Sequence, residues 1–164
     1  MLENIKRHAV RADAVFFVPA FFLYAGGMTL VGWDYLRRES GTGVARALNP
    51  VGILLVVLGL VFVLVAPITL RKNYSSTLVI RNDHKLIMHG IYRVVRHPIY
   101  LGAILVSLGV PVTASSWIAL PPMPLLIPLI VYRMRIEERL LLEEFGDDYR
   151  AYMARTKRLI PFLY

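Results

Sequence analysis

The chain contains no cysteine, and only eleven of its 164 residues are acidic. Without cysteine it has no disulfide framework, no thiolate nucleophile and no sulfur ligand for a metal. The histidines His84 and His89 have no carboxylate or further ligand at metal-binding spacing, so we expect no metal site. These absences exclude disulfide-rich secreted domains and zinc-binding modules.

Charge is missing from three long windows of the chain, residues 14–33, 47–70 and 98–132. Hydrophobic residues make up 57% of the chain and its mean hydropathy is +0.56, which places it in the membrane-protein class. A helix needs about 20 apolar residues to cross a bilayer, so the first two windows each predict one crossing. The third window is too long for one crossing and predicts a helical hairpin that turns near residues 111–117.

We therefore expect one all-α integral membrane domain over residues 1–164, with about four transmembrane helices and five as the alternative. The first window has the length of a full span and ends at Trp33, so we interpret it as a retained helix rather than a cleaved signal. Four prolines in the last window remove backbone donors and predict a short or bent fourth helix. They are Pro121, Pro122, Pro124 and Pro128.

Basic residues outnumber acidic ones, and the formal net charge is +8. In a four-span arrangement, the nineteen Lys and Arg residues divide into three in the N-terminal tail, three in the first loop, six in the second, none in the third and seven in the C-terminal tail. The positive-inside rule predicts this asymmetry when both termini are cytoplasmic. We therefore attribute the charge to membrane topology and to attraction by anionic lipid headgroups, and we expect no nucleic-acid partner.

A first polar cluster lies in the sequence GIYRVVRHPIYLG, residues 90–102, where a basic loop enters the third apolar window. Polar side chains at the boundary between water and membrane hydrocarbon are energetically costly, so their presence here favours a functional interpretation. Proline suits the first turn of a helix, so we expect His97 at or beside the N-cap, near the positive end of the helix dipole. The alternative is that Arg93, Arg96 and His97 only anchor a helix end among headgroups.

A second polar cluster follows the last window, in the sequence RMRIEERLLLEEFGDDYRAYMAR, residues 133–155. Its periodicity predicts an amphipathic cytoplasmic helix, with Glu137 near Arg133 and Glu138 near Arg135. Gly146 predicts a break before a last helix that carries Tyr149, Tyr152 and Arg155. Taken alone, this segment also fits an interfacial helix with solvated ion pairs.

Together the two clusters resemble the C-terminal half of the isoprenylcysteine carboxyl methyltransferase family, and more loosely the membrane phospholipid methyltransferases. The resemblance covers about residues 90–162 and depends on an ordered set of motifs: RHPxY, the paired glutamates and an FG-x-x-Y-x-x-Y-x-x-R ending. It implies an integral membrane enzyme that transfers a methyl group from S-adenosylmethionine to a lipid-phase acceptor and releases S-adenosylhomocysteine.

The resemblance also assigns site residues. It places in the cofactor-binding region Gly90, Tyr92, Arg96, His97, Pro98, Tyr100, Glu137 and Glu138. It places Arg155 at the reaction centre. We add Glu138 as a second catalytic candidate and Tyr149 and Tyr152 as substrate contacts. On this interpretation residues 1–70 form a two-helix scaffold and residues 90–162 the cofactor-binding region. No GxG-type turn joins a strand to a helix, so the soluble Rossmann route to this cofactor is absent.

Methyl transfer from a sulfonium depends mainly on alignment and on removing water from the nucleophile. A carboxylate acceptor needs no base, but it needs a fixed cation, and the planar fork of Arg155 fits that task. Glu137 or Glu138 suits the cofactor's ammonium. His97, Arg96 or backbone donors at the start of the third helix suit its carboxylate or ribose.

The sequence does not decide which molecule accepts the methyl group. Ile91 and Thr156-Lys157 depart from the proline and Val-Pro that are frequent in the isoprenylcysteine branch. An isoprenylcysteine-like carboxylate is favoured, and a thiol or a phospholipid amine is the alternative. An amine must lose a proton, which would make Glu138 or a neutral His97 a base. A non-enzyme alternative is a small membrane scaffold or sensor subunit whose charged tail binds a partner or anionic lipid.

Overall fold

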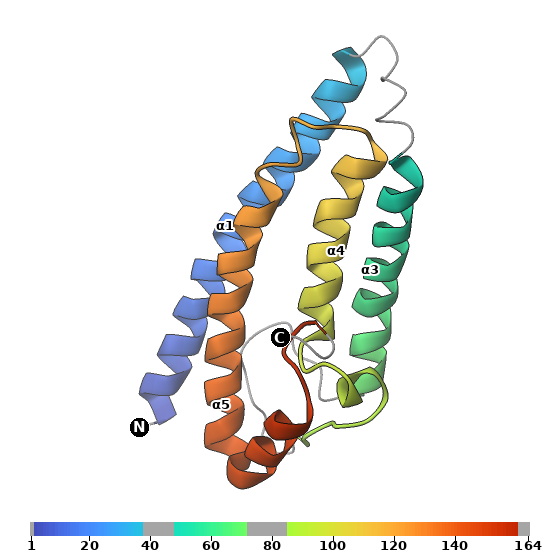
Figure 1. Cartoon of the computed structure of the whole chain (residues 1–164). Helices are drawn as coiled ribbons and strands as arrows, with labels where there is room; N and C mark the ends of the chain where they lie inside the picture. The colour runs from blue at the N-terminus through green and yellow to red at the C-terminus, as the bar shows by residue number, and fades with distance from the viewer. Residues whose placement is uncertain (1, 38–47, 72–84, 161–164) are drawn as a thin grey trace.

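A computed structural model describes residues 2–37, 48–71 and 85–160, with side chains from Asp13 onward. The long helices run alternately up and down (Figure 1). They are α1 (Leu2–Arg37), α3 (Asn49–Leu70), α4 (Pro98–Thr113) and α5 (Leu126–Arg155), joined by the short 3₁₀ helices η2 (Gly90–Arg93) and η3 (Met123–Leu125). Within these ranges no β-strand forms, and Val95 and Lys157 make an isolated parallel bridge. The predicted all-α class is confirmed for the described residues.

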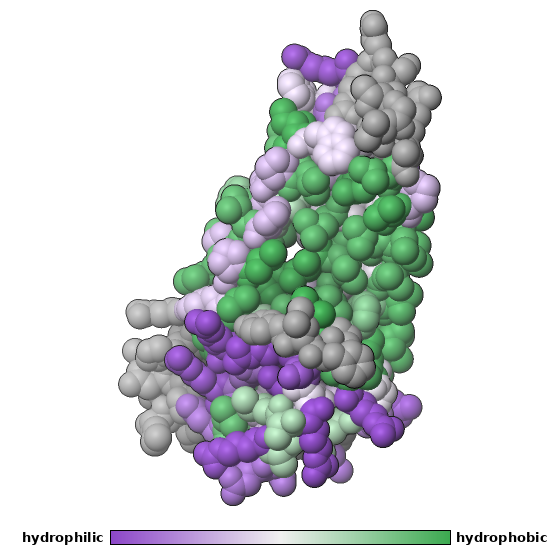
Figure 2. Space-filling view, viewed as in Figure 1, coloured by the Kyte–Doolittle hydropathy of each residue, from purple (hydrophilic) through white to green (hydrophobic). Residues whose placement is uncertain are grey.

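Two of these helices are long and apolar enough to cross a membrane: the Asp13–Arg37 part of α1, with 25 residues, and α3, with 22. Helix α4 is apolar but shorter. Figure 2 shows a broad hydrophobic belt over most of the visible face and hydrophilic residues gathered below it. The apolar belt is what a membrane-embedded helical protein needs, because lipid offers no hydrogen bonds to exposed polar groups.

The third apolar window forms a helical hairpin as predicted, but its connection covers residues 114–125 rather than 111–117. Helix α4 ends at Thr113, and α5 begins at Leu126 after a connection that contains η3. Pro98 occupies the first turn of α4, with His97 at its N-cap as expected, although the His97 side chain makes no capping hydrogen bond. The predicted short or proline-bent fourth helix is wrong: three of the four prolines precede α5, which has 30 residues and its non-helical residue at Gly146.

Helices α3 and α4 pack through glycines spaced seven residues apart on both helices, Gly52 and Gly59 on α3 and Gly102 and Gly109 on α4. A Cβ built on Gly59 would lie 2.7 Å from the Gly102 carbonyl oxygen, and one on Gly102 would lie 2.6 Å from the Gly59 carbonyl oxygen. Only hydrogen fits there. Small residues let transmembrane backbones approach closely, so this contact fixes α4 on α3.

Helix α5 packs instead on α1. A buried cluster of Leu126, Ile130, Met134 and Leu159 contacts Phe16, Ala20 and Leu23 of α1. Gly146 has φ +51 and ψ −120, so it breaks α5 as the sequence predicted. The chain beyond the break turns back toward the beginning of α4 (Figure 1). The start of α4 and the last turns of α5 thereby meet at the polar end of the molecule.

Candidate functional site

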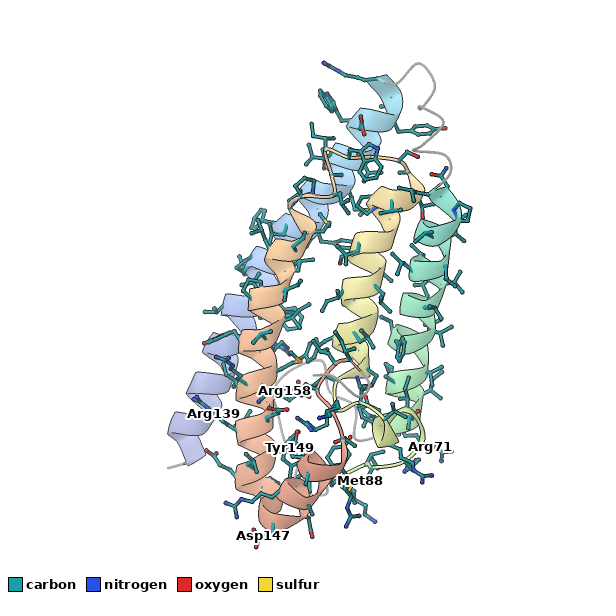
Figure 3. All side chains as sticks on the ribbon, viewed as in Figure 1. Arg71, Met88, Arg139, Asp147, Tyr149 and Arg158 are labelled. Carbon is teal, nitrogen blue, oxygen red and sulfur yellow. The ribbon has the colours of Figure 1, made fainter. Side chains whose placement is uncertain are left out.

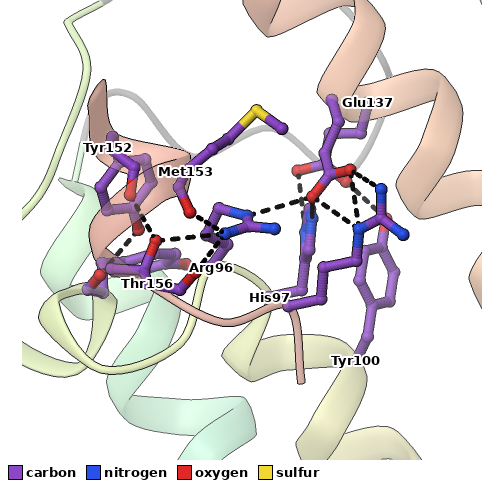
Figure 4. A network of polar contacts seen from close by, with 10 residues as sticks. Arg96, His97, Tyr100, Glu137, Tyr152, Met153 and Thr156 are labelled. Carbon is purple, nitrogen blue, oxygen red and sulfur yellow. Dashed lines mark hydrogen bonds and ion pairs between the residues drawn. The ribbon is translucent and has the colours of Figure 1, made fainter. Parts of the chain in front are cut away.

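The two polar clusters of the sequence meet in the structure around one buried carboxylate, that of Glu138 (Figure 4). Arg96 Nε donates to Glu138 Oε1 at 3.1 Å, and His97 Nε2 lies 3.4 Å from the same oxygen. The Glu138 side chain is only 4% exposed. Forty-one residues separate His97 from Glu138, so the loop before α4 and the middle of α5 depend on each other for this contact.

A third basic side chain, that of Arg158, completes the surroundings of Glu138. Arg158 Nε lies 2.9 Å from Glu138 Oε2, and Arg158 Nη2 lies 2.7 Å from it. Burial raises the pKa of the Glu138 carboxyl, but hydrogen bonds and charges from His97 and Arg158 outweigh it and lower the pKa to about 2. Glu138 lies about one helical turn from Arg135 as expected, but Arg135 is exposed and Glu138 is buried against Arg96, His97 and Arg158.

The neighbouring acid, Glu137, belongs to a second chain of contacts. The Tyr100 hydroxyl donates to Glu137 Oε2 at 2.8 Å, and Arg133 Nε donates to the Tyr100 oxygen at 2.8 Å. Arg133 Nη1 forms a buried ion pair with Asp13 of α1. Glu137 lies one helical turn from Arg133 as expected, and the Tyr100 hydroxyl links the two side chains. The Glu137 side chain keeps 33% of its surface exposed.

Arg96 also ties the end of α5 to the site. Its Nη1 donates to the carbonyl oxygens of Met153 and Thr156. Nearby, the Tyr152 hydroxyl donates to the Tyr92 carbonyl oxygen at 2.7 Å. Burial, opposed by the charge of Arg96, raises the pKa of Tyr152 to about 12, so its phenol stays neutral. These bonds hold the segment beyond Gly146 against η2.

Tyr149 is one of two described residues, with Ser116, that bury a hydroxyl without a hydrogen-bond partner. The residue is 1% exposed, and its hydroxyl makes no hydrogen bond with any described residue. Burial raises its pKa, and the charges of Glu138 and Glu137 raise it further, so the phenol stays protonated beside the two acids. Figure 3 shows Tyr149 with Arg158 at the polar end of the helices. A buried donor without an acceptor is costly, which makes Tyr149 a natural contact for a polar ligand.

The remaining predicted site residues lie at the edge of this cluster. Gly90 has φ +61, in the left-handed region, and opens η2 beside Thr69 of α3. Pro98 is buried at the first turn of α4. Arg155 is exposed in the last turn of α5 and forms no ion pair with a described residue. The structure therefore does not bring Arg155 to Glu138.

Backbone donors at the entrance of α4 are already used. The Arg96 amide donates to the Lys157 carbonyl at 2.8 Å, and the His97 amide donates to the Arg158 carbonyl at 3.0 Å. These two amides were expected among the donors for a cofactor. Since the returning chain occupies them, side chains rather than these amides face any ligand.

Sequence reasoning missed the site roles of Asp13, Arg133, Thr156 and Arg158. Asp13 and Arg133 stand 120 positions apart, beyond any helical periodicity. One feature of the sequence could have indicated this ion pair. An acidic residue at the start of one apolar window and a basic residue at the end of another are energetically costly in a membrane unless they pair. For Arg158, only the fold-back after Gly146 makes the contact.

Comparison with known proteins covers the same region. A sequence model described as the isoprenylcysteine carboxyl methyltransferase (ICMT) family matches residues 52–143. A probable protein-S-isoprenylcysteine O-methyltransferase of Oryza sativa subsp. indica is 29% identical over 116 residues, which cover 69% of this chain and 61% of that protein. The methanethiol S-methyltransferase 1 of Bradyrhizobium diazoefficiens is 38% identical over 72 residues, covering 44% of this chain and 25% of that protein.

A solved structure shares the fold. It is that of a eukaryotic intramembrane Ras methyltransferase, isoprenylcysteine carboxyl methyltransferase, with a TM-score of 0.72 and 24% identity. The match covers 90% of this chain and 54% of the other. The chain thus spans roughly half to three fifths of the length of these isoprenylcysteine methyltransferases. Since the family model extends over more than half of its residues, the chain belongs to the isoprenylcysteine carboxyl methyltransferase family.

Proposed function

We propose that the protein is an integral membrane methyltransferase that uses S-adenosylmethionine and methylates the carboxylate of a lipid-phase acceptor of the isoprenylcysteine kind. Family membership and the printed names of the relatives support the reaction class. The single observation that carries the proposal is the buried polar cluster around Glu138, at one end of apolar helices. A scaffold subunit has no need to bury so many charged groups, which are costly to dehydrate.

The residues present fit a cofactor with an ammonium, a carboxylate and hydroxyl groups. The Tyr149 hydroxyl is buried without a partner, and Glu137 keeps part of its carboxylate exposed. We assign the cofactor's ammonium to Glu137 rather than Glu138, because Arg96, His97 and Arg158 already surround Glu138. Glu138 then acts by holding these three groups in place.

The same assignment gives the other predicted residues their roles. Tyr149 donates its free hydroxyl to a polar group of the ligand, and His97 and Tyr100 present their rings beside the acids, with ring centres 5.6 Å apart. The edge of the proposed cofactor site is shaped by Gly90, Tyr92, Pro98 and Tyr152. The Tyr152 hydroxyl donates to the Tyr92 backbone carbonyl, and Pro98 lies in the first turn of α4. Arg155 has an exposed guanidinium available to draw the acceptor carboxylate toward the site.

When bound, S-adenosylmethionine supplies the methyl group and becomes S-adenosylhomocysteine. The acceptor carboxylate is already anionic near neutral pH, so the chain need not remove a proton. Its residues instead exclude water and fix orientation, which are the main sources of rate in such a displacement. The low pKa of Glu138 suits this reaction, because a carboxyl with a pKa of about 2 is a poor base.

We place the polar end on the cytoplasmic side, with both termini there and four helices crossing the membrane. The charge asymmetry of the sequence supports this orientation, as does the position of the beginning of α1 and the end of α5 at the same end of the molecule (Figure 1). A water-soluble cofactor then enters from the cytoplasm, and a lipophilic acceptor approaches from the bilayer.

A binding measurement tests the proposal first. Purified protein in detergent should bind S-adenosylhomocysteine, and membranes containing the protein should transfer labelled methyl to N-acetyl-S-farnesylcysteine. Glu137→Gln should weaken cofactor binding by about tenfold, the loss of one charge-assisted contact, whereas Arg155→Ala should lower transfer more than binding. Absence of cofactor binding by the wild-type protein would leave the scaffold alternative.

A thiol acceptor is the second candidate, favoured by the 38% identity to a relative named methanethiol S-methyltransferase 1. Methanethiol and the farnesylcysteine analogue should be compared at equal cofactor concentration. Transfer to the thiol alone would replace the carboxylate assignment and retain the methyltransferase. For a phospholipid amine acceptor, the low pKa of Glu138 disfavours this residue as the base and leaves His97 as the residue for that role.

A further inference from the structure

The first helix enters the site through a buried ion pair. Asp13 of α1 and Arg133 of α5 have side chains only 13% and 4% exposed. The Arg133 guanidinium also lies over the rings of Phe16 and Phe17, at 4.8 and 4.5 Å. A buried pair of this kind often adds no stability over well-packed apolar residues. Its presence at the edge of the apolar belt therefore calls for a reason other than stability.

The hydrogen bonds from this pair to Glu137 have only one possible direction. Arginine has no acceptor, so Arg133 Nε must donate to the Tyr100 oxygen. The single proton of Tyr100 is then free to donate to Glu137 Oε2, at 2.8 Å. The Asp13 carboxylate accepts a hydrogen bond from Arg133 Nη1, and this bond orients Arg133 Nε toward Tyr100.

We propose that Asp13 and Arg133 are positioning residues for the cofactor: acting through the Tyr100 hydroxyl, they hold the Glu137 carboxylate in the orientation that receives the cofactor's ammonium. This inference rests on the proposed function. The Tyr100 hydroxyl holds Glu137 Oε2, and His97 Nδ1 lies 3.9 Å from Glu137 Oε1, so the carboxylate has one orientation while 33% of the side-chain surface stays exposed to a ligand. Phe16 supports the arrangement by packing edge-to-face on Tyr100, with ring centres 6.3 Å apart.

It follows that α1 is more than a scaffold for the cofactor-binding region. It supplies the carboxylate that fixes the Arg133 guanidinium and the aromatic ring that packs on Tyr100. The division into residues 1–70 and residues 90–162 stays a prediction, but under this proposal the cofactor region depends on a residue from the first segment.

A double-mutant cycle tests the relay through the dissociation constant of S-adenosylhomocysteine in detergent. Asp13→Asn and Tyr100→Phe should each weaken binding, by roughly 5- to 10-fold, and the double variant should be no weaker than Tyr100→Phe alone. The reason is that Asp13 acts only through the hydroxyl that Tyr100→Phe removes. Asp13→Glu, which restores a carboxylate, should recover most of the affinity.

The matched control is Asp147→Asn, which removes a carboxylate from an ion pair with Arg150 whose side chains are 91% and 71% exposed. It should leave cofactor binding unchanged. Additive effects of Asp13→Asn and Tyr100→Phe would overturn the relay and reduce the ion pair to a contact between helices. Wild-type protein that binds no S-adenosylhomocysteine would instead refute the proposed function itself, so the two failures are distinguishable.

Discussion

The α3–α4 interface and the cluster around Glu138 are held together by opposite means. The first has Gly59 and Gly102 in backbone contact and depends on the absence of side chains. The second depends on charged side chains that satisfy one another in a buried place. The glycine contacts fix α4 against α3. Since Arg96, His97 and Tyr100 all lie at the beginning of α4, the same contacts set the position of these side chains. Close backbone packing therefore positions α4, and ion pairs hold the polar cluster at its beginning.

The strongest way to break the charged region is to remove its centre. Glu138→Ala leaves Arg96, His97 and Arg158 without their shared carboxylate, and we expect a loss of about 3–5 kcal/mol in the free energy of unfolding. The measurement is thermal or denaturant unfolding in detergent. An unchanged stability would show that solvent already screens the cluster.

The pH dependence of stability sharpens the same point. The pKa of Glu138 is lowered from 4.5 to about 2 on folding, so its contribution is complete above pH 4.5 and is lost as the pH falls toward about 2. Wild-type protein should therefore lose more stability across this window than Glu138→Ala, which lacks the titrating group. Equal losses in both proteins would assign the acid sensitivity to other carboxylates.

The glycine interface is tested by adding a single methyl group. Gly102→Ala places a Cβ 2.6 Å from the Gly59 carbonyl oxygen and 2.9 Å from Phe62 Cβ, so we expect a loss of about 1–3 kcal/mol. The matched control is Gly26→Ala on α1, where no atom lies within 4 Å of the added Cβ. It should be neutral or slightly stabilising, because alanine is the better helix former. Equal effects at the two positions would contradict close α3–α4 packing.

The smallest effect is expected at the hydrogen bond that joins the last turns of α5 to η2. Tyr152→Phe removes the bond from the hydroxyl to the Tyr92 carbonyl but keeps the ring, and it should cost about 1 kcal/mol. The unfolding midpoint should fall slightly, and the fold should be retained. A loss as large as that of Glu138→Ala would mean that the returning segment depends on this single bond.

How far the sequence predicts this molecule depends on the range of each interaction. The apolar windows predict the long helices, the length of the third window predicts the hairpin, and Gly146 predicts the break in α5, because each is a local property of the sequence. The meeting of RHPxY with the paired glutamates followed from the resemblance. The ion pair of Arg133 with Asp13 did not follow from the resemblance, and helix periodicity indicated Glu137 as a nearer partner of Arg133. The glycine contact also needs the register of two helices, which the spacing alone does not supply.

The break at Gly146 also bears on how the protein is made. The residues that complete the cluster, Tyr149, Tyr152, Thr156 and Arg158, all follow the break and are synthesised after every long apolar stretch. Membrane insertion of those stretches must therefore proceed without the finished cluster, while Arg96 and Glu138 still lack part of their native surroundings. A chain that stops at Gly146 would contain Glu138 without its partner Arg158, and Arg96 without its contacts in the returning segment.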